Sequence, residues 1–215
     1  MMLKKWTDLT RGAAVGVAFA LLACGGKNDS NANRIKPIVA TLAIQPPSTS
    51  PVVYFKPSPN DTAGDDLVLI DVMLQPSAPI NMDAFTLEVT FDPGLVQLAA
   101  LDAGSNPLGT CDILTPEGAT CLGSGACSSP LCCLNGEDVN RKGDLIFGVA
   151  TTSGLCAATS VSSEVKLATL GFTAASTGTS LIHLIPGQGG CAILDATMDL
   201  GIPCDDGGAT VTGSR

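Results

Sequence analysis

Residues 85–92, FTLEVTFD, alternate apolar and polar side chains without a break. A β-strand turns successive side chains to opposite faces, so this stretch predicts a strand with one face in a hydrophobic core. Residues 92–94, Asp-Pro-Gly, then end the strand, because proline cannot continue the hydrogen-bond ladder and glycine favours a turn. The expected core face is Phe85, Leu87, Val89 and Phe91, and the expected outer face is Thr86, Glu88, Thr90 and Asp92.

Apolar runs of strand length surround this stretch, separated by proline, glycine, asparagine and aspartate. Residues 67–74, LVLIDVML, are apolar at nearly every position, as in a central strand of a two-layer core. We expect Phe91 and its face to pack against Leu170 and Phe172 of the other layer. The spacing of the turns and the lack of a long helical period predict an all-β sandwich. The nine expected strands are 39–45, 52–56, 67–74, 85–92, 96–101, 145–149, 165–173, 179–185 and 209–212.

The composition excludes several classes of protein. The 215 residues carry 11 Lys and Arg against 20 Asp and Glu, a formal charge of −9, so nucleic acid is not the expected partner. Hydrophobic residues make up 45% of the chain and charged residues 14%, which argues against a disordered chain and against a coiled coil. Twelve acidic residues and no Lys or Arg lie between residues 57 and 140, a solvated acidic surface that could also attract a basic partner or weakly hold calcium.

The N-terminus predicts export. Residues 1–23 combine basic residues with the apolar run GAAVGVAFALLA at 12–23, the pattern of a signal peptide. The end of this run, LLAC, resembles the bacterial lipobox, which implies that Cys24 is acylated after cleavage. The alternative is an ordinary secreted protein with a stray cysteine. Residues 24–37 then form a polar tether, and the absence of aspartate after Cys24 favours the outer membrane or cell surface over the inner membrane.

Eight further cysteines predict disulfides. Residues 103–143 are rich in glycine, serine and cysteine, which indicates a disulfide-held insertion without a core of its own. Eight cysteines allow 105 pairings, and Cys191 with Cys204 is a reasonable local pair. Zinc is disfavoured, because no Cys-x-x-Cys pair is present and exported thiols are normally oxidised. The eight cysteines are Cys111, Cys121, Cys127, Cys132, Cys133, Cys156, Cys191 and Cys204.

Signals for catalysis or a cofactor are weak. His183 sits in a strand alternation, where a structural role is the ordinary interpretation, and no Gly-x-Ser-x-Gly elbow is present. Residues 138–144, DVNRKGD, begin like an EF-hand loop, but Lys142 stands where an oxygen ligand belongs and Val149 where a glutamate belongs. We therefore expect a simple turn there, with no metal, no cofactor and no catalytic residue.

The order of the strands resembles the cohesin family. The matching pieces are LVLIDVML at 67–74, an aromatic-Asp-Pro at 91–93, GDLIFGVA at 143–150 and a Leu-small-x-Leu-x-Phe strand at 167–172. The resemblance covers about residues 38–213 without the cysteine-rich insertion, which the family pattern lacks. It implies a nine-stranded jelly-roll sandwich related to bacterial carbohydrate-binding modules, and a dockerin module as partner.

Three functions remain open on the sequence. The first is a lipid-anchored, non-catalytic module that recruits a dockerin-like protein, held at the membrane through Cys24. The second is a carbohydrate-binding module of the same fold that serves polysaccharide breakdown, and the third is an anchored polysaccharide-active enzyme. The one tryptophan, Trp6, lies in the leader, and the chain has one tyrosine and six phenylalanines. Few rings are therefore present for stacking against sugars, which favours the protein-recruiting module.

Overall fold

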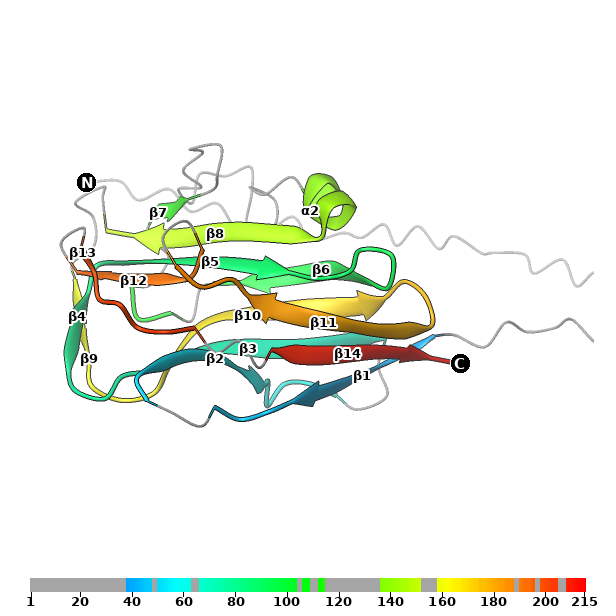
Figure 1. Ribbon diagram of the computed structural model, residues 1–215, viewed down its shortest axis with the longest axis horizontal. Coiled ribbons are helices and arrows are strands. Elements are labelled where there is room, and N and C mark those ends of the chain that lie inside the picture. Colours follow the sequence, from blue (N-terminus) through cyan, green and yellow to red (C-terminus); the bar gives the residue numbers. More distant parts are fainter. Residues whose placement is uncertain are drawn as a thin grey trace, which may run out of the picture. The chain divides into compact units, whose positions relative to one another are not determined.

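Strands make up most of the computed structural model, which describes residues 38–47, 50–62, 66–103, 106–108, 112–114, 136–151, 158–187, 190–195, 198–204 and 208–215 (Figure 1). They belong to one compact unit, Lys36–Arg215. The elements are β1 (Val39–Ile44), β2 (Val52–Pro57), β3 (Leu67–Gln75), β4 (Ile80–Met82), β5 (Ala84–Thr90), β6 (Val96–Asp102), β7 (Asp112–Leu114), α2 (Gly136–Lys142), β8 (Asp144–Ala150), β9 (Thr159–Val161), β10 (Val165–Ala174), β11 (Gly178–Leu184), β12 (Ala192–Asp195), β13 (Met198–Asp199) and β14 (Ala209–Ser214).

The larger sheet is antiparallel and is built around β5. Two strands share one edge of β5: β11 pairs with its C-terminal end and β12 with its N-terminal end. Strand β8 pairs with the opposite edge of β5, and β8 also pairs with β7. The order continues from β11 through β14 to β1. In Figure 1 these strands follow one another from β7 at the top to β1 at the bottom.

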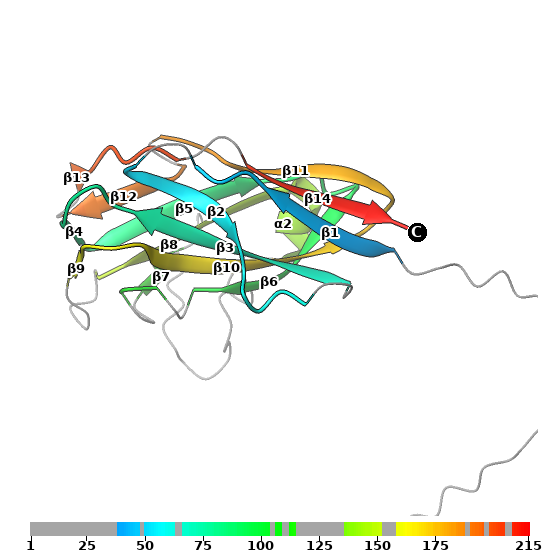
Figure 2. The same cartoon turned by 90° about the horizontal axis from the view of Figure 1, so that it is seen from below.

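The second sheet has the order β2-β3-β10-β6, also antiparallel, and it packs against the first. Strands β4 and β9 form a separate pair. Together with β13 they lie at one end of the sandwich, whereas the C-terminus lies at the other end (Figures 1 and 2). The prediction of an all-β sandwich is confirmed, and all nine expected strands are present in the described chain, joined by five short ones.

The core between the sheets contains the residues that the alternation predicted. Phe85, Leu87 and Val89 are fully buried, and the rings of Phe91 and Phe172 meet edge to face with centroids 5.3 Å apart. Burying one phenylalanine stabilises the fold by roughly 1.5–3 kcal/mol. This contact joins the end of β5 in one layer to β10 in the other.

Two expectations about residues 103–143 need correction. Most of the segment 138–144, expected to be a simple turn, belongs to helix α2, whose Val139 is buried in the core, and the turn into β8 is confined to Gly143. The ends of the insertion also belong to the sandwich: Ala103 and Leu108 are buried in the main core, and β7 pairs with β8. The cysteines of the insertion and Cys156 lie outside the described residues.

A disulfide joins Cys191 and Cys204, the pair that the sequence suggested. Cys191 immediately precedes β12 of the larger sheet, while Cys204 forms a bridge with Val53 of β2, whose N–H donates to the carbonyl of Pro203 over 2.9 Å. The bond therefore ties one sheet to the edge of the other. Cys24, the leader and the tether lie outside the described residues, and among the helical residues described none forms a span long and apolar enough to cross a membrane.

Candidate functional site

The outer side of β5 carries the polar residues that the alternation predicted. Thr86, Glu88 and Thr90 are each partly exposed, while the residues between them are buried. Strand β5 is central in its sheet, so these side chains lie in the middle of a broad surface rather than at its rim.

Neighbouring strands extend this surface. Thr90 lies between Asp144 of β8 and His183 of β11, and Glu88 is opposite Ile146. Residues directly opposite each other in a sheet share a face, so all of these side chains point outward. Leu181 lies two residues before His183 and is 44% exposed. We call this surface the β5–β8–β11 face, and it consists of Thr86, Glu88, Thr90, Asp144, Ile146, Leu181 and His183.

The charged residues of the β5–β8–β11 face are the acidic Glu88 and Asp144, and their strands carry no basic partner for them. Strands β5, β8 and β11 contain no lysine or arginine. Burial raises the pKa of the Glu88 carboxyl above its ordinary value, and the nearby Asp144 carboxylate raises this pKa further. One oxygen of Asp144, Oδ1, is buried without a hydrogen-bond partner in the described chain. The face thus holds two neighbouring carboxylates that nothing described on it neutralises.

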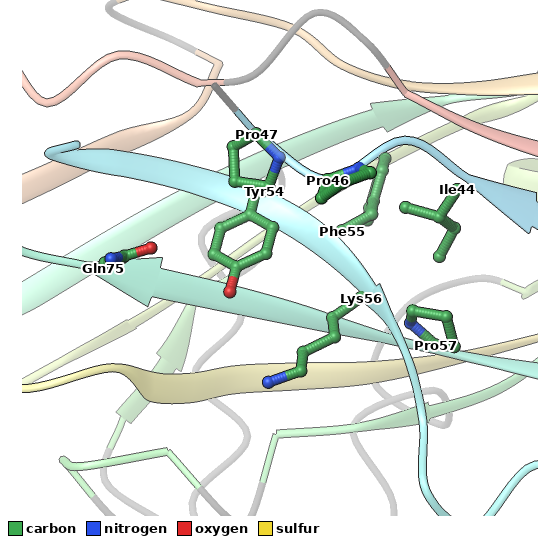
Figure 3. Close-up of a pocket in the computed structure, with 8 residues that line it drawn as sticks. All are labelled: Ile44, Pro46, Pro47, Tyr54, Phe55, Lys56, Pro57 and Gln75. Carbon is green, nitrogen blue, oxygen red and sulfur yellow. The ribbon is translucent and has the colours of Figure 1, made fainter. Parts of the chain in front are cut away.

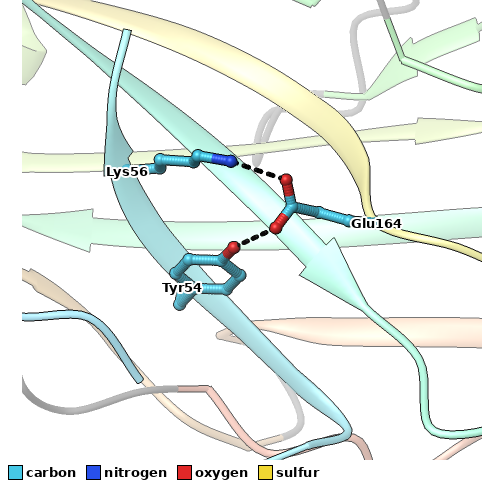
Figure 4. Close-up of polar contacts among 3 residues, drawn as sticks. All are labelled: Tyr54, Lys56 and Glu164. Carbon is cyan, nitrogen blue, oxygen red and sulfur yellow. Dashed lines mark hydrogen bonds and ion pairs between the residues drawn. The ribbon is translucent and has the colours of Figure 1, made fainter. Parts of the chain in front are cut away.

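The outer face of the second sheet has its charges paired. Lys56 Nζ lies 2.7 Å from Glu164 Oε1, and the hydroxyl of Tyr54 donates to the other oxygen of Glu164 (Figure 4). These two hydrogen bonds, from Lys56 and then Tyr54, lower the pKa of Glu164. Burial and the bond to Glu164 raise the pKa of Tyr54 to about 12.

A second charged group on this face is also satisfied. Asp71 is 5% exposed, accepts a hydrogen bond of 2.7 Å from Thr169 and lies 3.7 Å from the amine of Lys166. Both described lysines of these strands therefore have a carboxylate partner within the same face.

A hollow of about 330 Å³ lies beside edge strand β2 (Figure 3). Its wall is mostly apolar, and its amine and phenol groups, from Lys56 and Tyr54, are already bonded to Glu164. The hollow is therefore a weaker candidate for a binding site than the β5–β8–β11 face. The lining residues are Ile44, Pro46, Pro47, Tyr54, Phe55, Lys56, Pro57 and Gln75.

Most of the sequence-predicted site residues lie outside the described residues. Cys24, the proposed lipid site, and six of the eight other cysteines lie outside the described residues, and the pair Cys191–Cys204 links the sheets. His183 lies on the β5–β8–β11 face beside Thr90. Within the described residues, no group of three His, Cys, Asp or Glu side chains comes together as a metal site would require. The sequence signal for the face was the outward register of Glu88, but its neighbours Asp144, Ile146 and Leu181 could be gathered only by the strand order.

These observations define a β-sandwich module whose two sheets are linked by a disulfide. No protein-family model matches the chain, and no curated protein matches it. The search of solved structures finds cohesin modules, the family that the strand motifs resemble. The third cohesin ScaC of Acetivibrio cellulolyticus, solved with the ScaB dockerin, is 17% identical, with a TM-score of 0.47 over 72% of this chain and 94% of that one.

Two further similar structures come from the same organism. The sixth cohesin of scaffoldin B, solved with a mutant Cel5 dockerin, is 14% identical, with a TM-score of 0.45 over 72% of this chain and 93% of that one. A type II cohesin domain from the cellulosome is 13% identical, with a TM-score of 0.40 over 75% of this chain and 93% of that one.

Proposed function

We propose that this chain is an exported, non-catalytic binding module that takes up a protein partner on the β5–β8–β11 face. The observation that carries the proposal is the contrast between the two outer faces. The lysines of the second sheet are paired within their own face, while Glu88 and Asp144 have no basic residue on their strands. On the same face Ile146 and Leu181 offer partly exposed apolar surface, and a mixture of this kind is typical of interfaces between proteins.

A protein is favoured over a polysaccharide as the partner. Carbohydrate modules rely on flat rings exposed for stacking. Tyr54, on the outer face of the second sheet, is 6% exposed and its hydroxyl donates to Glu164. The described phenylalanines are buried in the core: Phe55, Phe85, Phe91, Phe147 and Phe172. The resemblance of the strand motifs to cohesins makes a dockerin-type module the partner that we propose.

The test is capture of a partner by the purified chain from the native envelope and secreted fraction, followed by measurement of the binary affinity. Leu181→Arg should abolish capture, because it places a long charged side chain in the contact surface. Thr173→Arg, on the outer side of β10, is the matched control and should leave capture intact. Equal capture by both variants would exclude the β5–β8–β11 face. If the purified chain hydrolysed a polysaccharide, and if replacing one of its carboxylates abolished this activity, the chain would be an enzyme and the proposed binding function would be wrong.

We also propose that Cys24 is the lipid-bearing first residue of the mature chain. The LLAC sequence, the apolar run at 12–23 and the polar residues 24–37 support this proposal. Several acyl chains, each adding about 0.8 kcal/mol per buried methylene, would hold the module stably at a membrane. Cys24→Ser should release the protein from membranes or leave its leader uncut. Normal processing together with unchanged membrane retention would contradict lipid attachment.

A further inference from the structure

We infer that the partner inserts a guanidinium group, flanked by apolar side chains, between Glu88 and Asp144 of the β5–β8–β11 face. This inference rests on the proposed function and specifies the chemistry of the partner surface. The inferred interface then has two parts: a charged contact at Glu88 and Asp144, and the apolar contact around Leu181.

The first argument is position. Thr90 is directly opposite Asp144, and Glu88 lies two residues before Thr90 on the same side of β5, so the two carboxylates are diagonal neighbours across adjacent strands. Diagonal pairs of this kind lie roughly 7–8 Å apart at their backbones, a separation that long side chains bridge. A planar group with several N–H donors fits between two such carboxylates better than a compact ammonium does.

The second argument is the state of these carboxylates. Oδ1 of Asp144 is buried and has no hydrogen-bond donor among the described residues. A buried oxygen is out of a partner's reach, so the atoms that a partner can meet are the partly exposed ones of Glu88 and Asp144. The basic residues nearest in sequence, Arg141 and Lys142, already have partners of their own. The positive charge that these carboxylates lack is therefore expected from another molecule, because β5, β8 and β11 contain no lysine or arginine.

The third argument is the apolar surroundings. Ile146 of β8 is opposite Glu88, and Leu181 and His183 lie on β11, which pairs with the other edge of β5. Apolar surface around a charge pair excludes water when the partner docks and so strengthens the attraction between the charges. The raised pKa of Glu88 agrees with an environment that is already partly dehydrated.

The site is tested without the natural partner by titrating the full chain with n-butylguanidinium chloride and following backbone amide signals by NMR. We expect saturable shifts centred on residues 86–90 and 144–146. Glu88→Gln and Asp144→Asn should each weaken this binding by roughly fivefold, the size expected of one partly exposed charge pair. Glu164→Gln is the control, because that carboxylate already binds Lys56, and it should leave the titration unchanged.

Three results would overturn the inference: shifts centred elsewhere, equal weakening by Glu164→Gln, or complete displacement of the probe by stoichiometric calcium, which would make the pair a metal site. Sodium pentanoate, which has the same butyl chain and the opposite charge, should produce no shifts on this face.

Once a partner has been captured, its affinity separates this inference from the proposed function. We expect Glu88→Gln and Asp144→Asn to lower the affinity and added salt to do the same. If Leu181→Arg abolishes binding while both carboxylate variants and salt leave the affinity unchanged, the module function stands and the guanidinium anchor fails. If Leu181→Arg has no effect, the proposed face itself fails.

Discussion

The side-chain amide of Asn140 pairs with the backbone of Leu98 as a neighbouring strand would. Asn140 Oδ1 accepts from the Leu98 N–H at 2.7 Å, and Asn140 Nδ2 donates to the Leu98 carbonyl at 3.0 Å. Leu98 lies on β6, the edge strand of the second sheet, so one residue of α2 satisfies backbone groups that an edge would leave open.

Replacing this asparagine should therefore weaken the fold and open the edge. We expect Asn140→Ala to lower the free energy of unfolding by about 1–3 kcal/mol, because two hydrogen bonds are lost. The variant should also associate at high concentration through the exposed edge of β6. Urea denaturation and analytical ultracentrifugation measure the two effects. Asn81→Ala, at an exposed position of β4, should change neither.

Phe91→Ala should destabilise the protein severely. The ring of Phe91 is 7% exposed and packs on Phe172, so its removal leaves a cavity between the two sheets. Phenylalanine-to-alanine changes in cores cost about 3–5 kcal/mol. Leu181→Ala, at an exposed position, should stay within about 0.5 kcal/mol of the wild type. Comparable losses for both variants in urea denaturation would contradict the assigned core.

Gly143→Ala should be more damaging than an ordinary change at a left-handed glycine. Gly143 follows α2 with φ of 72°, and a Cβ there would lie 2.2 Å from the carbonyl oxygen of Phe91. Gly201 has φ of 63° and open space around the same position, so Gly201→Ala isolates the cost of the backbone conformation. That cost is about 1–2 kcal/mol. Thermal denaturation should show a larger loss for Gly143→Ala, and equal losses would mean that the backbone relaxes freely.

Breaking the disulfide should loosen the join between the two sheets. In the chain-entropy view, closing the 13-residue separation between Cys191 and Cys204 stabilises the fold by roughly 3 kcal/mol. The double variant Cys191→Ser/Cys204→Ser should lose about this amount. Hydrogen exchange should be accelerated at the Val53 amide, which bonds to Pro203, and unchanged protection there would show that the segment stays in place without the bond.

The contact among Tyr54, Lys56 and Glu164 should make stability depend on pH at both extremes. The pKa of Glu164 is lowered on folding, so its contribution is present above the ordinary value of 4.5 and is lost as the pH falls through the folded value. The pKa of Tyr54 is raised to about 12, so its contribution is present below 10.0 and is lost as the pH rises through about 12. Tyr54→Phe should flatten the loss at high pH, as measured by denaturant unfolding across the pH range. An equally steep loss in this variant would assign the dependence to other groups.

The long strands could be predicted because their patterns are local. The alternation in FTLEVTFD at 85–92 predicts both the strand and which of its faces points inward, and that face is buried in the structure. Helix α2 could not be predicted from its sequence, because GEDVNRK contains a single apolar residue, Val139. The helix is held by tertiary contacts of Val139 and of Asn140. A bulge between Lys166 and Ala168 likewise places Leu167 and Ala168 both in the core, which strict alternation does not anticipate.

The candidate site was less accessible to prediction than the fold. The outward direction of Glu88 followed from the alternation, whereas its neighbours depend on which strands flank β5. Asp144 begins a strand 56 positions further along the chain and Leu181 lies on yet another strand, so their proximity is a product of sheet order and register. The charge pairing of the second sheet is equally non-local, since Lys56 and Glu164 come from opposite halves of the chain.

The pairing of β1 with β14 has a mechanical consequence. Val39 is opposite Ser214 and Ile44 is opposite Ala209, so the strand that enters from the N-terminal side is held along its whole length by the last strand. A pull on the N-terminus along the direction of β1 loads these hydrogen bonds in shear, all at once, whereas a pull at right angles would open them one after another. In a module anchored at its N-terminal side and bound on the β5–β8–β11 face, force would therefore pass first through the hydrogen bonds between β1 and β14.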